Sequence, residues 1–463
     1  MSKKESSLVK SSIFFAFYQI SDITAYQSFI LLIFTFYFTV IGIEIWLITT
    51  GYIIWAVWNA LNDPLLGYLS DKTHTRWGRR RPWIMASFIP LGIFIWLLYT
   101  PVLPQGLTYQ VGNFIYFLIV IIIFEFFYTM FSLNSTSMFP EVFLSKKERT
   151  TANNFRQVFT IIGLIVAFIL PGIIIGEYTD PSNLTNYQIF GIIAGVVVII
   201  CAVIFLKFSP REKAEFKEDS KEAFSLFKSM KFCIKSRSFR WYIPAEIANW
   251  FVYGILPTIV PLYAEFVLNI TDAFLISLLL GITFISAAIF MTILWKPLVR
   301  KIGNRKSWMI SLTIWFFTLL PLMFISDMIS GMIVFTLVGI GLSGSFYIID
   351  LIVADIIDED ELATGIRREA GYYGVNAFFL RFSNVFVILA IGTILSTVGW
   401  TTFEPTLVTP QVIFGLRSLM FIFPGIAIII AILAIYRYPL DGEKLVKIKE
   451  DLKKIHEEKR ARI

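Results

Sequence analysis

Residues 188–207 read QIFGIIAGVVVIICAVIFLK, a run of twenty residues whose single charge is its last residue. A helix of this length spans the roughly 30 Å hydrocarbon core of a bilayer. Residues 208–240 follow at once and form the longest polar stretch inside the chain, with a dense group of charges at Arg211, Glu212, Lys213, Glu215, Lys217, Glu218 and Asp219. The boundary between the two stretches predicts a membrane protein that is divided near its middle by a polar linker.

Similar apolar runs recur along nearly the whole chain. Its 463 residues are 57% hydrophobic and 16% charged, with a mean hydropathy of +0.73, and a soluble protein of this length needs a larger charged surface. Helices satisfy their backbone polar groups internally in lipid, whereas membrane barrels show alternating segments of about ten residues. We therefore predict an all-α membrane protein with about twelve spans, at 12–35, 46–70, 83–101, 112–134, 157–176, 188–207, 241–266, 274–296, 307–326, 331–354, 371–397 and 412–436.

The charges between the spans predict the orientation of the chain. Loops near 36–45, 102–111, 177–187, 267–273, 327–330 and 398–411 contain no Lys or Arg, whereas the alternate loops are rich in both. Basic loops stay cytoplasmic, so we predict a multi-pass protein of the plasma membrane with both termini in the cytoplasm. The net charge of +7 then reflects orientation and contact with anionic lipid rather than nucleic-acid binding.

The linker divides the predicted spans into six and six. Two bundles joined by a cytoplasmic linker are the architecture of the major facilitator fold. We predict an N-terminal bundle at 1–207, a cytoplasmic linker at 208–240, a C-terminal bundle at 241–436 and an amphipathic tail at 437–463. The tail either docks under the bundle or binds a partner. Cys201 and Cys233 fall in a span and in the linker, so no disulfide framework is predicted.

Asp63 is the leading candidate for a coupling site. A charge at bilayer depth costs several kcal/mol and therefore calls for a function or a partner. Asn59 precedes Asp63 by four residues, so the two side chains share a helix face and can bind a small cation, or the carboxylate alone can carry a proton. The alternative is a structural ion pair, and Arg381, in the middle of the eleventh span, is a suitable counter-ion.

Other polar residues within the spans are candidates for contact with a solute. Glu125 has an alternative role in an interhelical hydrogen bond made while protonated, and Arg156 has one as an interfacial anchor. The full set predicted to bind substrate is Tyr18, Asp22, Glu125, Tyr128, Ser132, Thr136, Arg156, Glu246, Trp250, Asn376 and Arg381.

Two long motifs resemble the glycoside–pentoside–hexuronide:cation symporter family, of which melibiose permease is the best-known type. The first combines residues 59–71, NALNDPLLGYLSD, with residues 76–83, RWGRRRPW; the second combines residues 354–361, ADIIDEDE, with TGIRRE at 364–369 and YYG at 372–374. The resemblance spans the chain and implies symport driven by sodium, protons or lithium. Charged residues in these motifs are predicted to form a cytoplasmic gate, namely Asp71, Arg76, Arg79, Arg80, Arg81, Asp355, Asp358, Arg367 and Arg368.

The resemblance also implies roles for single residues. Asp63 matches the inner of two acids of the family's cation site, and Arg156 matches an arginine near the sugar. Arg381 stands where the family commonly has a lysine, and Asp22 lies near a sugar-binding acid. The outer acid of the cation pair is replaced by Asn59, which favours a proton as the coupling ion over Na⁺ at Asp63.

We predict cation-coupled symport of a sugar, glycoside or related small solute by a protein that functions as a monomer. One alternative is a carrier of an amphipathic lysolipid, suggested by the aromatic richness and by substituted sugar ligands in the fourth span. Another is a membrane sensor or enzyme without transport. Against an enzyme or a resident cofactor, the chain has no nucleotide-binding loop, and its two histidines, His74 and His456, are far apart.

Overall fold

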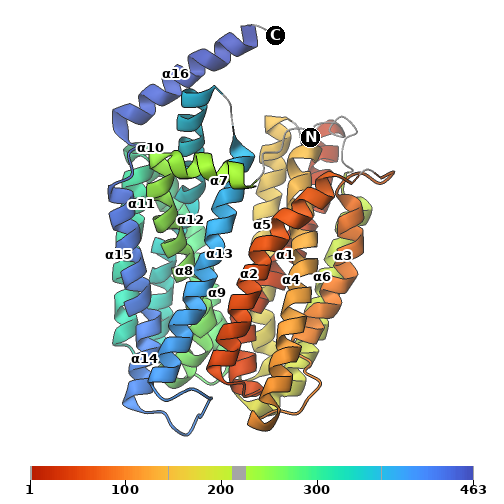
Figure 1. The fold of residues 1–463 in the computed structure, drawn as a ribbon, viewed down its shortest axis with the longest axis vertical. Helices are drawn as coiled ribbons and strands as arrows, with labels where there is room; N and C mark the ends of the chain where they lie inside the picture. Colours follow the sequence, from red (N-terminus) through yellow and green to blue (C-terminus); the bar gives the residue numbers. More distant parts are fainter. Residues whose placement is uncertain (1–2, 74, 144, 211–225, 366–367, 462–463) are drawn as a thin grey trace.

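The computed structural model describes residues 3–73, 75–143, 145–210, 226–365 and 368–461. Long helices stand side by side in two groups (Figure 1). The first group comprises α1 (Lys3–Thr35), α2 (Ile45–Asp71), α3 (Arg81–Leu98), α4 (Gln110–Val142), α5 (Lys146–Ile175) and α6 (Leu184–Phe208). The second comprises α8 (Arg237–Phe266), α9 (Ala273–Phe290), α10 (Lys296–Ile302), α11 (Asn304–Leu319), α12 (Met328–Thr364), α13 (Glu369–Thr397), α14 (Pro410–Met420) and α15 (Ile422–Tyr436).

The helices account for the predicted spans. Among the described residues, eleven helical segments are long and apolar enough to cross a membrane. α2 is a twelfth long helix of 27 residues, and Asn59, Asn62 and Asp63 lower its hydropathy. The prediction of an all-helical membrane protein with about twelve spans is confirmed.

Two spans predicted as single helices are interrupted. The eighth contains a π-helical turn, η6 (Met291–Trp295), between α9 and α10. The twelfth breaks at Phe421, where α14 ends and α15 begins. Pro424 lies in the first turn of α15, where its missing N–H removes a hydrogen bond to the preceding turn and its ring crowds that turn, both of which favour a break at this point. Conversely, α12 continues as one helix to Thr364, ten residues beyond the predicted end of the tenth span at 354.

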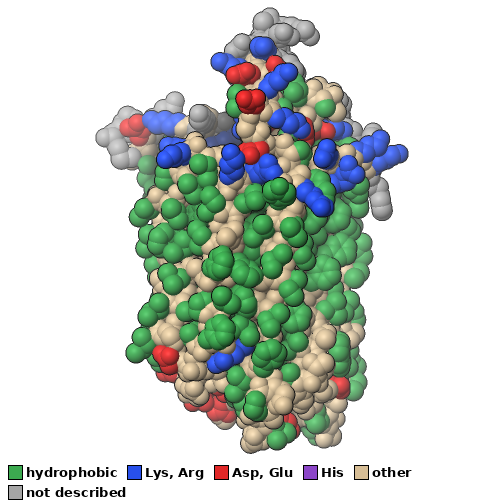
Figure 2. Space-filling model, turned by 90° about the vertical axis from the view of Figure 1, so that its left-hand side faces the viewer, with side chains coloured by type: hydrophobic (Ala, Val, Ile, Leu, Met, Phe, Trp, Pro, Cys, Tyr) green, Lys and Arg blue, Asp and Glu red, His purple; other side chains and the backbone are tan. Residues whose placement is uncertain are grey.

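The two ends of the molecule differ in charge. Lys and Arg side chains gather at the end that carries both termini, a belt of hydrophobic side chains follows, and acidic side chains lie at the opposite end (Figures 1 and 2). We call the first the basic end. The loops of the other, the acidic end, contain Glu44, Glu177, Asp180, Asp272, Asp327 and Glu404. An exposed apolar belt is expected to face hydrocarbon rather than water.

Contacts between the halves close the acidic end. α1 contacts α8, α2 contacts α13 and α5 contacts α9. At Gly172 in α5, a Cβ atom would lie 2.8 Å from the backbone oxygen of Ala273 in α9, so the two helices touch there through their backbones. Hydrogen bonds join the halves nearby, from Ala273 N to Gly176 O at 2.7 Å, from Ile45 N to Thr401 O at 2.9 Å, and between the hydroxyls of Tyr178 and Ser277 at 2.5 Å.

Two further helices lie outside the spans. α7 (Leu226–Lys235) crosses the basic end and contacts α13 (Figure 1). α8 begins at Arg237, so the last residues of the predicted linker 208–240 belong to the second bundle, while residues 211–225 lie outside the described residues. α16 (Gly442–Ala461) packs on α12. Its Ile448 and Leu452 are buried, and Lys449 pairs with Asp355 at 2.8 Å.

Candidate functional site

Asp63 and Arg381 form an ion pair between the two halves. Asp63 lies on α2 and Arg381 on α13, and Nη2 of the arginine donates to Oδ2 of the acid. Both side chains are about a quarter exposed, at 23% and 25%. A guanidinium keeps its charge at any relevant pH, so a carboxylate partner stabilises it at this depth. The structure thus forms the counter-ion pair that the sequence suggested.

A second carboxyl group, that of Glu125 on α4, completes this cluster. The Thr129 hydroxyl lies 3.1 Å from Oδ1 of Asp63 and 3.2 Å from Oε1 of Glu125. The indole N–H of Trp55 donates to Oε2 of Glu125 at 2.9 Å. Glu125 is 1% exposed, so it has almost no access to solvent. We call Asp63, Glu125, Thr129 and Arg381 the carboxylate cluster.

The carboxylate cluster needs one additional positive charge to become neutral. Two carboxylates and one guanidinium give a net charge of −1, which is costly at bilayer depth. The Thr129 hydroxyl has a single hydrogen but touches two carboxyl oxygens. Both contacts become hydrogen bonds when Glu125 is protonated, because its O–H then donates to the hydroxyl while the hydroxyl donates to Asp63. One proton, or one monovalent cation, neutralises the site.

Helix periodicity brings these side chains together. Trp55, Asn59 and Asp63 recur every four residues on α2, and Thr129 follows Glu125 by four on α4, so each set lines one helix face. Asn62 donates to the backbone oxygen of Glu125 at 3.4 Å. Asn59 is fully buried, and its amide has no hydrogen-bond partner within the described part of the chain. A buried amide without partners is uncommon, and it adds ligand capacity beside Asp63.

A second cluster, formed by α1, α4 and α5, contains most of the predicted substrate residues. Asp22 interacts with Ser132, Tyr128 and Arg156, and the Tyr18 hydroxyl interacts with Thr136 and Arg156. We call these six residues the Asp22–Arg156 cluster.

Arg156 is held among oxygen atoms and aromatic rings. With the Gln19 amide turned so that its oxygen faces α5, that oxygen accepts from Nε and Nη2 of Arg156 at 3.1 and 3.0 Å. The guanidinium also lies over the rings of Phe139 and Tyr18, at 4.5 and 5.6 Å. These contacts fix the position of a cationic donor group that interacts electrostatically with the Asp22 carboxyl.

The two clusters are connected by stacked tyrosines. Tyr26, on α1, stacks on Tyr128 of α4 with ring centroids 5.0 Å apart. Tyr26 also interacts with Arg381, Glu125 and Asp63. One end of this stack therefore lies within electrostatic range of the carboxylate cluster, and the other end reaches Asp22 through the interaction of Tyr128 with that acid. A change at either cluster has a short, packed path to the other.

Glu246, Trp250 and Asn376 lie apart from both clusters, in the second half. The indole N–H of Trp250 donates to Oε1 of Glu246 at 3.0 Å, and Asn376 and Tyr242 interact with the same carboxyl. Glu246 is 1% exposed. The sequence placed Glu246 and Trp250 in a second polar patch in the second half, and in the structure Glu246, Trp250 and Asn376 contact one another between α8 and α13.

The predicted gate residues bind partners near the basic end. Arg79 and Arg80 contact Oε1 of Glu141 at 2.6 and 3.0 Å, and Arg76 lies over the Trp77 ring at 4.5 Å. Arg81 donates to the Leu206 carbonyl. Asp355 binds Lys449, Arg368 pairs with Asp360, and Asp358 also has partners. Arg367 and the side chain of Asp71 lie outside the described residues.

Three residues in or beside these clusters were not predicted from the sequence, namely Trp55, Thr129 and Tyr26. Each stands four or eight residues from a residue that was chosen, since Trp55 precedes Asp63 by eight, Thr129 follows Glu125 by four and Tyr26 follows Asp22 by four. The spacing on one helix face could have identified all three. The approach of Glu125 to Asp63 had no such signal, because it depends on how α2 packs against α4.

The family model described as MFS/sugar transport protein matches residues 9–442. The chain belongs to this family. Its predicted membership of the sugar–cation symporters of the major facilitator superfamily is confirmed, and these proteins are transporters rather than enzymes. A membrane sensor or enzyme without transport is therefore excluded as its class.

Two groups of curated relatives cover most of the chain. The isoprimeverose transporter of Lactiplantibacillus pentosus is 23% identical, over 83% of this chain and 80% of the relative. The sodium-dependent lysophosphatidylcholine symporter 1 of Gallus gallus is 25% identical, over 87% of this chain and 81% of the relative. A sugar transporter and a lysolipid symporter are thus among its relatives.

Solved structures confirm the fold. The nucleoside transporter NupG superposes with a TM-score of 0.66, covering 94% of this chain and all of NupG, at 16% sequence identity. The D-xylose–proton symporter superposes with a TM-score of 0.61 at 13% identity, covering 95% of this chain and 97% of that protein. The major facilitator fold is therefore established for a multi-pass, integral membrane protein.

Proposed function

We propose that this protein is a proton-coupled symporter for a sugar or glycoside that works by alternating access. The observation that carries the proposal is the Asp22–Arg156 cluster. Sugar hydroxyls both donate and accept hydrogen bonds, and this cluster offers a carboxyl group as acceptor, a guanidinium as donor and four hydroxyls that do either. Aromatic rings beside the polar groups suit the apolar face of a pyranose, a combination typical of small-molecule sites.

The carboxylate cluster supplies the coupling step of the proposal. In the form closed at the acidic end, Glu125 holds the proton and Asp63 pairs with Arg381. When the halves rearrange, α13 moves relative to α2 and the ion pair separates, so the preference of the cluster for a proton changes with the conformation. Protonation at one face and release at the other then couple the ion to the solute. Thr129 is the group through which the proton passes between the two carboxyls.

A proton suits this site better than Na⁺. Na⁺ requires several oxygen ligands at once, and Arg381 already occupies one oxygen of Asp63. Glu125 needs only a proton to become neutral, and its neutral form fits the contact with Thr129. Na⁺ bound by Asp63 and Asn59 is the competing arrangement, and it requires Arg381 to withdraw.

The experiment that tests the function is uptake into proteoliposomes containing the purified full-length protein. A panel of mono- and disaccharides, glycosides and lysophospholipids is offered with an inward proton gradient, an inward Na⁺ gradient or no gradient. We expect a sugar or glycoside to accumulate only with the proton gradient. Accumulation of a lysophospholipid driven by Na⁺ would establish the second candidate function, which the lysophosphatidylcholine symporters among the relatives favour. A panel without transport of any sugar would overturn the proposal.

Substitutions in the Asp22–Arg156 cluster test substrate binding. Arg156→Gln and Asp22→Asn are each expected to weaken binding of the transported sugar by about 10- to 100-fold, because each removes a charge-assisted hydrogen bond worth roughly 1.5–3 kcal/mol. The measurement is the dissociation constant from isothermal titration calorimetry. Trp250→Phe, which changes the separate contacts on α8, serves as the control and should leave the affinity within about threefold. If Trp250→Phe lowers the sugar affinity as much as the other two variants do, the assignment of the Asp22–Arg156 cluster as the sugar site is wrong.

Cysteine labelling tests the proposed orientation, with the basic end in the cytoplasm. Lys306, at the basic end, and Thr406, at the acidic end, are both exposed. A membrane-impermeant maleimide should label Thr406→Cys in intact cells, and Lys306→Cys only after permeabilisation. The native cysteines should remain silent, since Cys201 and Cys233 are buried and burial raises the pKa of the Cys233 thiol to about 12, which leaves little reactive thiolate. Labelling of Lys306→Cys in intact cells would reverse the orientation.

A further inference from the structure

The loop that joins α5 to α6 reaches from the first half of the molecule into the second. α5 ends at Ile175, and Gly176 then adopts a φ of +83°, a conformation that glycine tolerates best and that turns the chain sharply. We call residues 176–180, at the acidic end, the strap. Connecting loops usually run over the surface, yet Tyr178 is fully buried and Thr179 is 5% exposed. The middle of the strap therefore lies inside the molecule.

Hydrogen bonds join the strap to α8 and α9 of the second half. They run from Ala273 N to Gly176 O at 2.7 Å, between the hydroxyls of Tyr178 and Ser277 at 2.5 Å, and from the Thr179 hydroxyl to Oε2 of Glu265. The first bond uses backbone atoms. The other two depend on side chains, and Ser277 is fully buried, as Tyr178 is. These two bonds can therefore be removed one at a time by substitution.

The first half holds the strap in shape through hydrogen bonds of its own. The Tyr187 hydroxyl donates to the Tyr178 carbonyl at 2.7 Å, and Nδ2 of Asn183 donates to the Glu177 carbonyl at 3.1 Å. Asn183 belongs to a 3₁₀ turn, η3 (Pro181–Asn183), and Tyr187 belongs to α6. Because neither donor is part of the second half, the strap can keep its shape when the halves separate at this end. Its bonds to α8 and α9 are the ones that break.

The strap borders a tight contact between α5 and α9. An added Cβ at Gly172 would lie 2.8 Å from Cα of Phe274, so the two backbones lie against each other there. One helical turn further from the acidic end, the rings of Phe168 and Phe284 stack with their centroids 5.2 Å apart. α5 and α9 thus lie face to face along this stretch, and the strap covers its end at the acidic side.

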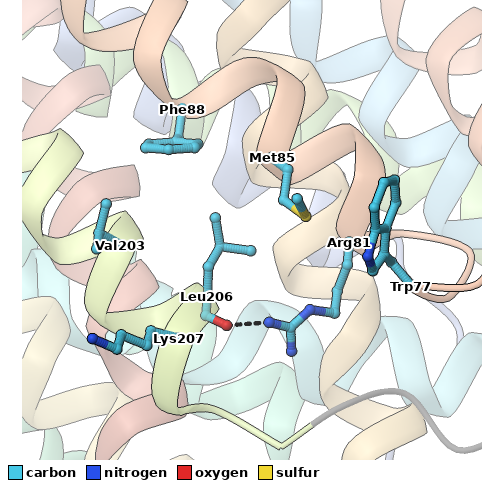
Figure 3. A pocket seen from close by; sticks show the side chains of 7 residues that line it. All are labelled: Trp77, Arg81, Met85, Phe88, Val203, Leu206 and Lys207. Atoms are coloured by element: carbon cyan, nitrogen blue, oxygen red, sulfur yellow. Dashed lines mark hydrogen bonds between the residues drawn. The ribbon is translucent and has the colours of Figure 1, made fainter.

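Charged side chains at the basic end make contacts of a different kind. Arg81 donates to the Leu206 carbonyl of α6, within the first half (Figure 3). Lys449 of α16 binds Asp355 of α12 at 2.8 Å, within the second half. Contacts inside one half persist when the halves move as units, whereas the bonds from the strap to α8 and α9 do not. The bonds of the strap therefore distinguish a state closed at the acidic end from a state open there.

We propose that the strap holds the acidic end closed and that its two side-chain hydrogen bonds set how often this end opens. The proposal rests on the alternating access of the proposed function, but it does not depend on which solute or ion is carried. A strap of fixed shape is either seated against α8 and α9 or released, so we expect two discrete states. Removing a bond that is made in the seated state lowers the population of that state.

The rate at which a buried cysteine is labelled from the acidic end measures how often that end opens. Thr258 on α8 is 7% exposed, and its hydroxyl lies 3.4 Å from the Ile30 carbonyl of α1, so it lies between the halves. The full-length Thr258→Cys protein, in cells or inverted vesicles without solute, is treated with a membrane-impermeant maleimide from the side on which the exposed Thr406→Cys is labelled. When opening is fast compared with labelling, the rate is proportional to the open fraction.

Tyr178→Phe and Thr179→Val, each added to Thr258→Cys, are expected to raise the labelling rate about three- to tenfold, the effect of one net hydrogen bond. Tyr263→Phe is the matched control. Tyr263 is as buried as Tyr178, and its hydroxyl donates to the Leu322 carbonyl at 2.6 Å, within the second half. This variant loses a buried hydrogen bond that does not cross between the halves, so its labelling rate should stay within about twofold.

A double variant tests whether Tyr178 acts through Ser277. Ser277→Ala added to Tyr178→Phe should label no faster than Tyr178→Phe alone, because both substitutions remove the same bond. Effects that multiply in the double variant would contradict the proposal. So would an unchanged rate in either Tyr178→Phe or Thr179→Val, or an equal rise in Tyr263→Phe, which would indicate general loosening.

The outcome is separate from that of the uptake experiment. The labelling assay requires no solute, so a negative result would leave the proposed symport intact, and the failure of every sugar in the uptake panel would leave the role of the strap intact. Monodisperse elution and an unchanged melting temperature establish that each variant is folded.

Discussion

Asp63→Asn is expected to abolish accumulation of the substrate against its gradient. The substitution keeps the size of the side chain and removes the charge that pairs with Arg381. Without that charge the carboxylate cluster has one carboxyl group and one guanidinium, which are neutral together without a bound proton, so the driving ion loses its site. In proteoliposomes with an inward proton gradient, the ratio of internal to external substrate should fall to about one, while exchange and equilibrium binding persist.

A control distinguishes lost coupling from damaged structure. Removing one partner of a fully buried ion pair costs roughly 3–5 kcal/mol, and the cost here should be smaller because both side chains are about a quarter exposed. The double variant Asp63→Asn/Arg381→Gln removes both charges and should recover the melting temperature without recovering accumulation. If Asp63→Asn still concentrates the substrate, Asp63 is a structural partner of Arg381 and the coupling proposal is wrong.

Glu125→Gln should produce the second large effect, the loss of pH dependence. An amide resembles the protonated carboxyl in shape and charge, so the variant is fixed in the proton-loaded form. In the wild type, substrate affinity should fall as the pH rises, because deprotonation of Glu125 leaves the cluster with a net negative charge. In Glu125→Gln the affinity should stay constant between about pH 5 and pH 9, exchange should continue, and proton-driven accumulation should disappear.

Glu246→Gln is a closely matched control for this variant. Glu246 is as buried as Glu125, at 1% exposure, and it also accepts from a tryptophan indole, at 3.0 Å compared with 2.9 Å. Its carboxyl interacts with Trp250, Tyr242 and Asn376 rather than with Asp63 and Arg381. Glu246→Gln should therefore retain pH-dependent affinity and accumulation. Retained accumulation in Glu125→Gln, or the same loss in both variants, would show that Glu125 does not carry the coupling proton.

The fold could be predicted because its determinants lie along the chain. The length of each apolar run identified the spans, and the absence of Lys and Arg from alternate loops indicated which loops lie on the same side of the membrane. Interruptions of the helices, which depend on local backbone geometry, were harder to predict from the sequence. The break at Phe421 follows from Pro424, but a proline inside an apolar run is also compatible with a continuous kinked helix. The π-helical turn at Met291–Trp295 has no comparable residue to mark it.

The sequence identified the charged residues of the candidate site, but it did not fully indicate which of them lie together. Asp63 and Arg381 were matched across the halves because each needed an opposite charge at bilayer depth. Glu125 was predicted either to contact the substrate or to form an interhelical hydrogen bond while protonated, and in the structure it lies near Asp63, with Thr129 between the two carboxyls. The packing of many side chains decides which faces of α2 and α4 meet. This packing cannot be read from a single sequence.

Because α16 is attached to α12, it moves with the second half of the molecule and offers a position for a label outside the membrane-spanning helices. Lys449 and Lys444 bind Asp355 and Glu359 of α12, so a spin label on the exposed Glu450 of α16 would travel with α12. A second label near Lys147, where α5 begins, would travel with the first half. The distance distribution between them would then report the rocking of the halves in a working transporter, with both labels in water and none in the solute's path.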